Sequence, residues 1–145
     1  MSPGAAAGCF FCRIARGEEP GALVLETAAV VAFLDHRPLF PGHCLVIPRR
    51  HVATLGDLPA ALTAPLWDAV RILARAVEGA LGADGSFVAV NNRVSQSVPH
   101  LHVHVVPRRR GDGLRGFFWP RGRYAGPAEI EDVRRRIAAA AAAAG

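Results

Sequence analysis

The sequence lacks the features that would place the chain in or across a membrane. No stretch reaches the roughly 18 uninterrupted apolar residues of a membrane-spanning helix, although 51% of the 145 residues are hydrophobic. The opening residues, MSPGAAAGCFFCR, have no charged segment followed by a long apolar run, so they do not resemble a secretory signal. We therefore expect a cytoplasmic globular protein with no membrane partner, whose length suits one domain with its own core.

Cysteine is also scarce, and Cys9, Cys12 and Cys44 are the only three. Without a secretory signal, three cysteines suit free thiols or a metal site better than a disulfide framework. The C-x-x-C spacing of Cys9 and Cys12 is half of a common zinc site, although redox motifs share this spacing. Cys44 lies in an apolar run and is expected to be a buried small residue.

Acidic residues are in the minority, 12 against 17 basic residues, which gives a net charge of +5. The basic excess is concentrated after the last predicted strand, at Arg108, Arg109, Arg110, Arg115, Arg121 and Arg123. Each arginine alone suits a solvated surface, but the group suggests an anionic ligand such as a phosphate. No aromatic-rich nucleic-acid motif accompanies the arginines, so a nucleic acid is not the expected partner.

The apolar pattern predicts five strands and two helices. β-Branched apolar runs at 22–26, 29–34, 43–48, 86–92 and 99–107 predict the strands, and the first two form a hairpin. Apolar residues spaced by three and four predict a long helix that begins between Pro59 and Pro65 and ends at Gly82. Residues 127–137, with acids first and arginines later, predict a second helix. The order β-β-β-α-β-β-α favours an antiparallel sheet of about five strands in an α+β fold, with its helices to one side.

The chain shows no linker and no internal repeat. We expect residues 1–8 to be disordered, residues 9–137 to form a single domain, and the alanine-rich residues 138–145 to extend the C-terminal helix. Residues 9–19 are predicted to form a short turn or helix.

The segment HLHVHVV, residues 100–106, places His100, His102 and His104 at alternate positions. Side chains alternate across a strand, so the three imidazoles are expected on one face and the aliphatic residues between them on the other. Such a face can hold a metal, perform chemistry, or do both.

The chain resembles the histidine triad (HIT) family of nucleotide hydrolases and transferases over roughly residues 8–108. The likeness is carried by CFFCRIARGEEP, FLDHRPLFPGHCLVIPRRH and NNRVSQSVPHLHVHVVPR, three blocks in the family's order. The resemblance implies a HIT-like fold with one long helix and a C-terminal helix, and a homodimer.

The resemblance implies that His102 is a nucleophile whose ring nitrogen attacks the α-phosphorus of a nucleotide, forming a covalent intermediate that water hydrolyses. A backbone carbonyl would hold the other ring N–H of His102. By the same resemblance, His104 contacts phosphate oxygens or the leaving group, and Ser97 lies near the leaving atom. Donors around a transferring phosphoryl group stabilise the charge that develops on it.

Nucleotide-binding positions also follow from the resemblance. Asp35 would accept hydrogen bonds from ribose hydroxyls, which suits a carboxylate, although an aspartate here also favours a turn. The remaining positions would wall the base or lie near the phosphates: Phe11, Ile14, Leu34 and His36 at the base, and Asn91 and Gln96 at the phosphates. Phe11 is equally suited to the core.

Bacterial family members with this C-x-x-C hold a structural zinc, and the matching positions here are Cys9, Cys12, His51 and His100. Two cysteines and two histidines form a closed tetrahedral set, which is typical of structural zinc. His100 would then face the metal while His102 and His104 face the nucleotide. We assign no chemistry to His43.

The resemblance implies an enzyme that releases a nucleoside monophosphate such as AMP from a dinucleoside polyphosphate or a nucleoside phosphoramidate. Pro107 and Arg108 after the triad favour polyphosphates. The base preference, the pathway and the role of residues 108–124 stay open. Alternatives are a non-catalytic nucleotide sensor or scaffold, a nucleotidyl transferase, and a protein that only binds metal, which would leave Asp35, Gln96 and Ser97 unexplained.

Overall fold

The structure, a computed structural model, describes residues 6–115 and 121–144. Its strands are β1 (Leu23–Glu26), β2 (Val30–Leu34), β3 (Cys44–Pro48), β4 (Gly85–Val90) and β5 (Val103–Arg108). Its helices are α2 (Phe10–Ala15), α3 (Thr63–Leu81) and α4 (Pro127–Ala144), with 3-10 turns at Leu55–Asp57 and Ala60–Leu62. No helix among the described residues is long and apolar enough to cross a membrane.

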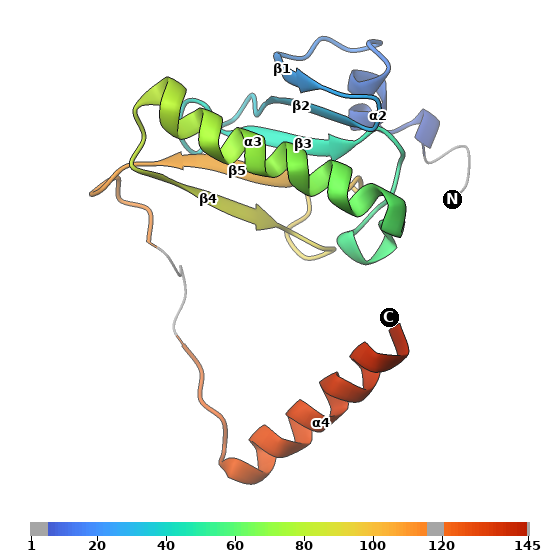
Figure 1. Cartoon of the computed structure of the whole chain (residues 1–145), viewed down its shortest axis with the longest axis vertical. Helices are drawn as coiled ribbons and strands as arrows, with labels where there is room; N and C mark the ends of the chain where they lie inside the picture. The colour runs from blue at the N-terminus through green and yellow to red at the C-terminus, as the bar shows by residue number, and fades with distance from the viewer. Residues whose placement is uncertain (1–5, 116–120, 145) are drawn as a thin grey trace. The chain divides into compact units, whose positions relative to one another are not determined.

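The five strands form one sheet in the order β1-β2-β3-β5-β4, and every neighbouring pair is antiparallel (Figure 1). The sheet confirms the predicted α+β fold. β5 lies between β3 and β4, and the β3–β5 register places Leu45 opposite His104. The central position of β5 fixes the triad segment on both sides, because both of its edges are paired.

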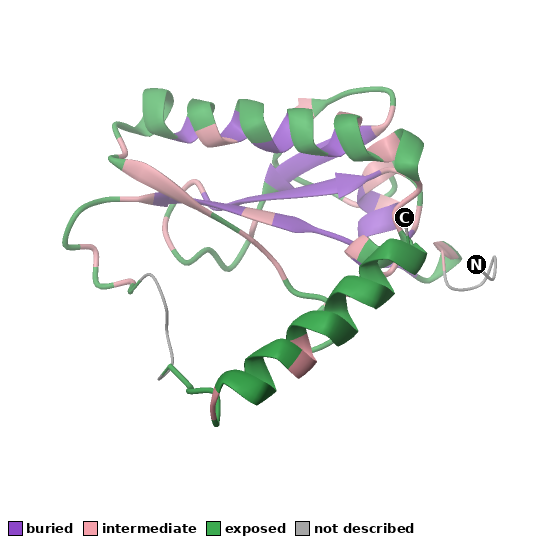
Figure 2. Ribbon diagram, turned by 60° about the horizontal axis from the view of Figure 1, so that its bottom comes forward, coloured by how far each residue is buried: buried purple, intermediate pink, exposed green. Residues whose placement is uncertain are grey.

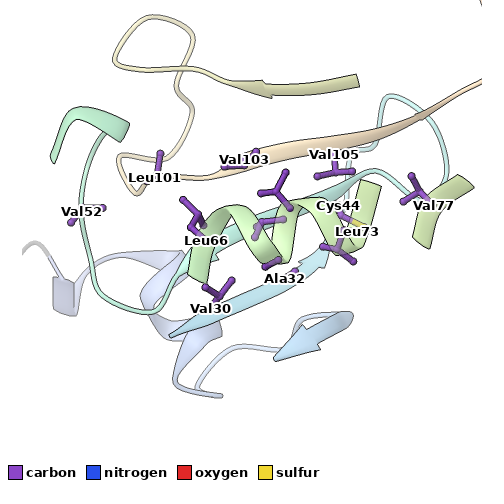
Figure 3. Packing of buried hydrophobic residues seen from close by; sticks show 13 residues of the cluster. Val30, Ala32, Cys44, Val52, Leu66, Leu73, Val77, Leu101, Val103 and Val105 are labelled. Atoms are coloured by element: carbon purple, nitrogen blue, oxygen red, sulfur yellow. The ribbon is translucent and has the colours of Figure 1, made fainter. Parts of the chain in front are cut away.

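The long helix α3 covers one face of the sheet and forms the larger core with it (Figures 1 and 3). Leu66, Val70, Leu73 and Val77 recur at the predicted spacing and are all buried. They pack against residues of the central strands and of the segments around them: Val30, Ala32, Cys44, Val46, Leu101, Val103 and Val105. The helix ends at Gly82, whose φ of 63° is left-handed and suits glycine. The predicted start, end and apolar face of this helix are therefore confirmed.

The opposite face of the sheet carries a second apolar cluster under α2. Phe11 and Ile14 of α2 pack with Phe33 of β2 and with Leu45 and Ile47 of β3. Burial is concentrated in the central strands, which are covered on both faces (Figure 2). The prediction of helices on one side was therefore wrong for α2, because its apolar residues have a second sheet face to cover.

The triad segment enters the sheet later than predicted. The regular strand begins at Val103, whereas the sequence predicted it from residue 99. The N–H of His100 donates to the Val98 carbonyl at 2.8 Å, and the N–H of Leu101 donates to the Val52 carbonyl at 2.7 Å. These bonds lie outside the sheet ladder, so the chain turns at His100 before it pairs with β3 and β4. The alternation still holds, since Leu101, Val103 and Val105 all join the core under α3.

The chain divides into two compact units, the first ending at Asp112 and the second beginning at Gly113. The second unit contains α4, which confirms the predicted C-terminal helix and runs to Ala144. The expected single domain over residues 9–137 stays a prediction. Residues 6–7 are helical and the Cys9 N–H donates to the Ala6 carbonyl, while residues 1–5 lie outside the described part. The expected disorder of residues 1–8 stays a prediction.

Candidate active site and metal centre

The ring of His102 is held by one main-chain hydrogen bond. Its Nδ1 lies 2.8 Å from the carbonyl oxygen of His100, and its side chain is buried. A carbonyl oxygen only accepts, so Nδ1 of His102 carries the proton. The neutral ring therefore keeps its lone pair on Nε2, which is the tautomer a nitrogen nucleophile requires.

A second chain of hydrogen bonds fixes the tautomer of His104. The N–H of Leu39 donates to Nδ1 of His43 at 3.1 Å, so a neutral His43 carries its proton on Nε2. Nε2 of His43 lies 2.9 Å from Nδ1 of His104, which therefore accepts. The remaining proton of His104 is on Nε2, a buried atom for which the described residues supply no partner. His104 thus offers an N–H donor.

His43 and His104 are both neutral near pH 7. Burial lowers the pKa of His104 to about 4, and the neighbouring rings of His102 and His43 add to the effect. Burial also lowers the pKa of His43, while the Asp35 carboxylate opposes that shift from 3.8 Å. A neutral donor can bind a phosphoryl oxygen without itself changing charge.

A cavity of about 480 Å³ lies on the sheet face under α2. Eight of the predicted site residues line it: Phe11, Ile14, Leu34, Asp35, His36, Ser97, His102 and His104. Phe11 and Phe33 meet edge to face in its wall with ring centres 5.3 Å apart, and Phe11 also lies 5.2 Å from the ring of His102. The cavity therefore has an apolar end at the aromatic rings and a polar end at the histidines.

Asp35 lies at the rim, directly after β2. Its Oδ1 accepts the N–H of Arg37 at 2.9 Å, and its own N–H donates to the His43 carbonyl at 2.8 Å. These bonds fix the turn that the sequence predicted and also orient the carboxylate at the cavity. The turn and the binding hypothesis for Asp35 are thus compatible.

Two predicted residues do not line this cavity. The side chain of Gln96 forms hydrogen bonds within the protein. Its Nε2 donates to the Ala53 carbonyl at 2.6 Å, and its Oε1 accepts a hydrogen bond from the Arg93 N–H at 2.8 Å. Asn91 is exposed and lies just after β4. The structure thus gives Gln96 a loop-shaping contact, and the roles proposed for Gln96 and Asn91 at the phosphates stay predictions.

A separate cluster lies behind His102. The ligand atoms of Cys9, Cys12, His51 and His100 all lie within 4.8 Å of one another. Nδ1 of His100 is 3.4 Å from each sulfur, and Nδ1 of His51 is 3.3 Å from the Cys12 sulfur. Nε2 of His100 donates a hydrogen bond to the Pro48 carbonyl at 2.8 Å. The lone pair of the ring is therefore on Nδ1, which faces the sulfurs and can bind a metal.

The donor set fits a zinc ion. Two sulfurs and two imidazole nitrogens converge from α2 and the residue before it, from the segment after β3 and from the triad. This composition is typical of closed tetrahedral zinc. Without a cation, burial and the neighbouring Cys9 raise the pKa of Cys12 to about 11. Such a thiol loses its proton when a metal binds, so binding would release protons.

Two of the arginines at the end of β5 and directly after it make structural contacts within the chain. Arg108 forms a bidentate pair with Asp112, at 2.6 and 3.0 Å, and Arg109 donates to the Leu81 carbonyl at the end of α3 at 2.6 Å. None of the described arginines lines the cavity. The sequence hypothesis that these arginines bind an anion therefore gains no support from Arg108 and Arg109.

The chain matches the HIT domain family model over residues 16–111. It is 36% identical to an adenylylsulfatase of Arabidopsis thaliana over 73% of this chain and 55% of that protein. It is 35% identical to an adenosine 5'-monophosphoramidase of Schizosaccharomyces pombe, covering 77% and 83%. It is 38% identical to a bis(5'-nucleosyl)-tetraphosphatase of the same yeast, covering 60% and 49%.

A Zn-bound histidine triad family protein from Mycobacterium smegmatis has a similar solved structure. It is 34% identical with a TM-score of 0.71, over 93% of this chain and 99% of that one. The fold, the three histidines and these matches agree, and the chain belongs to the HIT family.

Proposed function

We propose that the protein releases a nucleoside monophosphate such as AMP from a nucleotide derivative, through a covalent intermediate on His102. At the coarse level the protein is a nucleotide hydrolase, as the names of its relatives support. The observation that carries the finer proposal is the hydrogen bond from Nδ1 of His102 to the His100 carbonyl, because it leaves the Nε2 lone pair free to attack.

In the first step, Nε2 of His102 forms a bond to the α-phosphorus, and the bond from phosphorus to the leaving atom breaks. Nδ1 keeps its proton, so the phosphorylated ring is positive and its N–H is held by the His100 carbonyl. Ser97 lines the cavity, and its hydroxyl is the donor that we assign to the leaving atom. In the second step, water bonds to phosphorus, its proton is released, and His102 leaves as neutral imidazole.

His104 supplies electrostatic stabilisation in both steps. Its Nε2–H donates to a phosphoryl oxygen, and the proton stays in place because His43 blocks the other ring nitrogen. A buried donor that needs no reorganisation is worth more than one in water. At the nucleoside end of the cavity, Asp35 accepts hydrogen bonds from the ribose hydroxyls, while Phe11 and Ile14 contact the base.

A structural zinc belongs to the same proposal. Cys9, Cys12, His51 and His100 would hold it, and when bound it supplies a cross-link between α2 and the triad segment. The set has no open position for substrate, so zinc has no part in the chemical step. The homodimer expected from the resemblance, and the cytoplasmic location, remain predictions.

The test compares the wild type with His102→Asn on adenosine 5'-phosphoramidate and on diadenosine tetraphosphate, following AMP release. We expect release by the wild type alone, with AMP binding retained by the variant. A rapid quench should also trap AMP on His102, identified by mass spectrometry of the peptide. Equal rates for the two proteins would contradict the covalent mechanism.

A nucleotide sensor without catalysis is the second candidate. It would bind AMP with the same residues but release none from either substrate. The fixed tautomers of His102 and His104 favour the enzyme, since tight binding alone does not require a free lone pair on Nε2 of His102.

A further inference from the structure

The short helix α2 carries part of the apolar end of the nucleotide cavity. Phe11 and Ile14 line the cavity, and both are buried. A helix of six residues is too short to be stable by itself, so contacts with the rest of the protein decide where it lies. Whatever holds α2 in place therefore also positions these two side chains in the cavity wall.

One guanidinium joins the end of α2 to the hairpin of β1 and β2. Nη1 of Arg49 donates to the carbonyl of Ala15, the last residue of α2, at 2.9 Å. Nε of Arg49 donates to the Thr27 carbonyl in the hairpin turn at 2.9 Å, and Nη2 donates to Oε2 of Glu26 at 3.2 Å. The main-chain N–H groups of residues 16–18 bind the three carbonyls before that of Ala15, so Arg49 completes the end of the helix.

The main chain of Arg49 anchors this contact in the sheet. Arg49 directly follows β3, and its N–H donates to the Ala29 carbonyl at 2.9 Å. The side chain of Arg49 is 32% exposed, whereas the next residue, Arg50, is classed as exposed. A planar guanidinium holds several acceptors in one fixed geometry, which a lysine does not. The two adjacent arginines look alike in the sequence, and only the structure tells them apart.

We propose that Arg49 is a positioning residue for nucleotide binding, which holds α2 so that Phe11 and Ile14 contact the base. The inference rests on the proposed function, because it concerns the nucleoside end of the same cavity. The described residues that line the cavity do not include Arg49, so its effect is transmitted through α2. An interaction that stabilises bound substrate and transition state equally lowers KM and leaves kcat unchanged. Loss of Arg49 should therefore weaken nucleotide binding without slowing the chemical step.

The test compares Arg49→Met with Arg50→Met, which removes the same charge at the adjacent exposed position. Both are made in the His102→Asn background and titrated with AMP and with methyl β-ribofuranoside 5-phosphate, which keeps the ribose and phosphate but lacks the base. We expect Arg49→Met to weaken AMP about tenfold and the compound without the base less than about twofold. Arg50→Met should leave both affinities within about twofold of the parent.

Equal weakening of both ligands would indicate general damage and would overturn the role of Arg49, as would no weakening of either. Arg49→Lys keeps the charge but cannot hold all three acceptors, so it should also bind AMP less tightly than the parent. This variant decides the matter if Arg49→Met does not fold, and an unchanged affinity of Arg49→Lys for AMP would overturn the proposal.

Kinetics with an intact His102 separate this role from the proposed function. On adenosine 5'-phosphoramidate, Arg49→Met should raise KM about tenfold and change kcat less than about twofold. A fall in kcat with an unchanged KM would overturn the positioning role. If the wild type releases no AMP, the hydrolase proposal fails, and the titrations with the two ligands still decide whether Arg49 places α2 at the base.

Discussion

The carbonyl oxygen of His100 accepts the Nδ1–H of His102 at 2.8 Å, while Nδ1 of the same His100 lies 3.4 Å from the sulfurs of Cys9 and Cys12. One residue therefore contributes its main chain to the candidate nucleophile and its side chain to the metal cluster. Any displacement of this residue changes both sites together.

Leu101, between the two histidines, is fully buried under α3, and its replacement tests this link. Leu101→Ala should lower the free energy of unfolding by about 2–5 kcal/mol and should also lower kcat, because the cavity lets the His100 carbonyl move. Leu66→Ala removes a fully buried leucine from the α3 side of the same core and is the control. Chemical denaturation and AMP release check both variants. A similar fall of kcat in both would show that the effect is general loss of packing.

His43 tests whether the tautomer of His104 matters. His43→Phe removes the N–H that Nδ1 of His104 accepts, so the proton of His104 is free to occupy either nitrogen. We expect kcat for AMP release to fall about tenfold to a hundredfold, the value of a hydrogen bond to a charged group. His43→Gln retains an N–H donor at this position and should restore most of the activity. Two variants with equal activity would mean that His43 only fills space.

Asp35→Asn tests the ribose contact. The amide still accepts the Arg37 N–H, so the turn should hold, but the charge that would bind the ribose hydroxyls is lost. We expect KM to rise about tenfold or more with little change in kcat. A substrate without the 2'- and 3'-hydroxyls should bind both proteins equally. Equal losses on that substrate would assign Asp35 to the turn alone.

Much of the fold could be predicted because its signals are local. The spacing of Leu66, Val70, Leu73 and Val77 predicts the buried face of α3, and Gly82 marks its end. The alternation of Leu101 and Val103 with the histidines predicts that the aliphatic side chains share one face, and the structure places that face under α3. The late start of β5 could not be predicted, because the bond from Leu101 to Val52 joins residues far apart in the sequence.

In the candidate site, too, some features could be predicted from the sequence, and others depend on contacts between residues far apart in it. The grouping of Cys9, Cys12, His51 and His100 was predicted from the family resemblance, and the structure brings their ligand atoms together. His43 was left without a role because its partner is decided by the β3–β5 register, which places Leu45 opposite His104. A histidine after a Pro-Gly turn gives no local signal of that pairing. The contact of Gln96 with the Ala53 carbonyl was not predicted for the same reason, since the two residues are far apart in the sequence.

The stability of the protein should depend on pH through His104. The pKa of His104 is about 4 in the folded state and 6.5 when the side chain is not buried, as in the unfolded state. The unfolded state therefore binds more protons between these two pH values. Stability should therefore be constant above about pH 6.5 and fall as the pH drops towards 4, by about 3 kcal/mol at most from this group. His104→Gln should have a flatter profile over that window, measured by denaturant titration at each pH. An unchanged slope would show that His104 does not carry the effect.

Metal removal should destabilise the protein before it affects the chemical step. If zinc binds the Cys9, Cys12, His51 and His100 cluster, a free zinc concentration 1,000 times Kd adds about 4 kcal/mol to the free energy of unfolding. A chelator or Cys12→Ser should then lower Tm and abolish zinc binding, measured by differential scanning calorimetry and metal analysis. Cys44→Ser is the control, because Cys44 is equally buried but lies in the core under α3. Its loss of stability should leave one zinc bound per chain, whereas a chelator that leaves Tm of the wild type unchanged would argue against a structural metal.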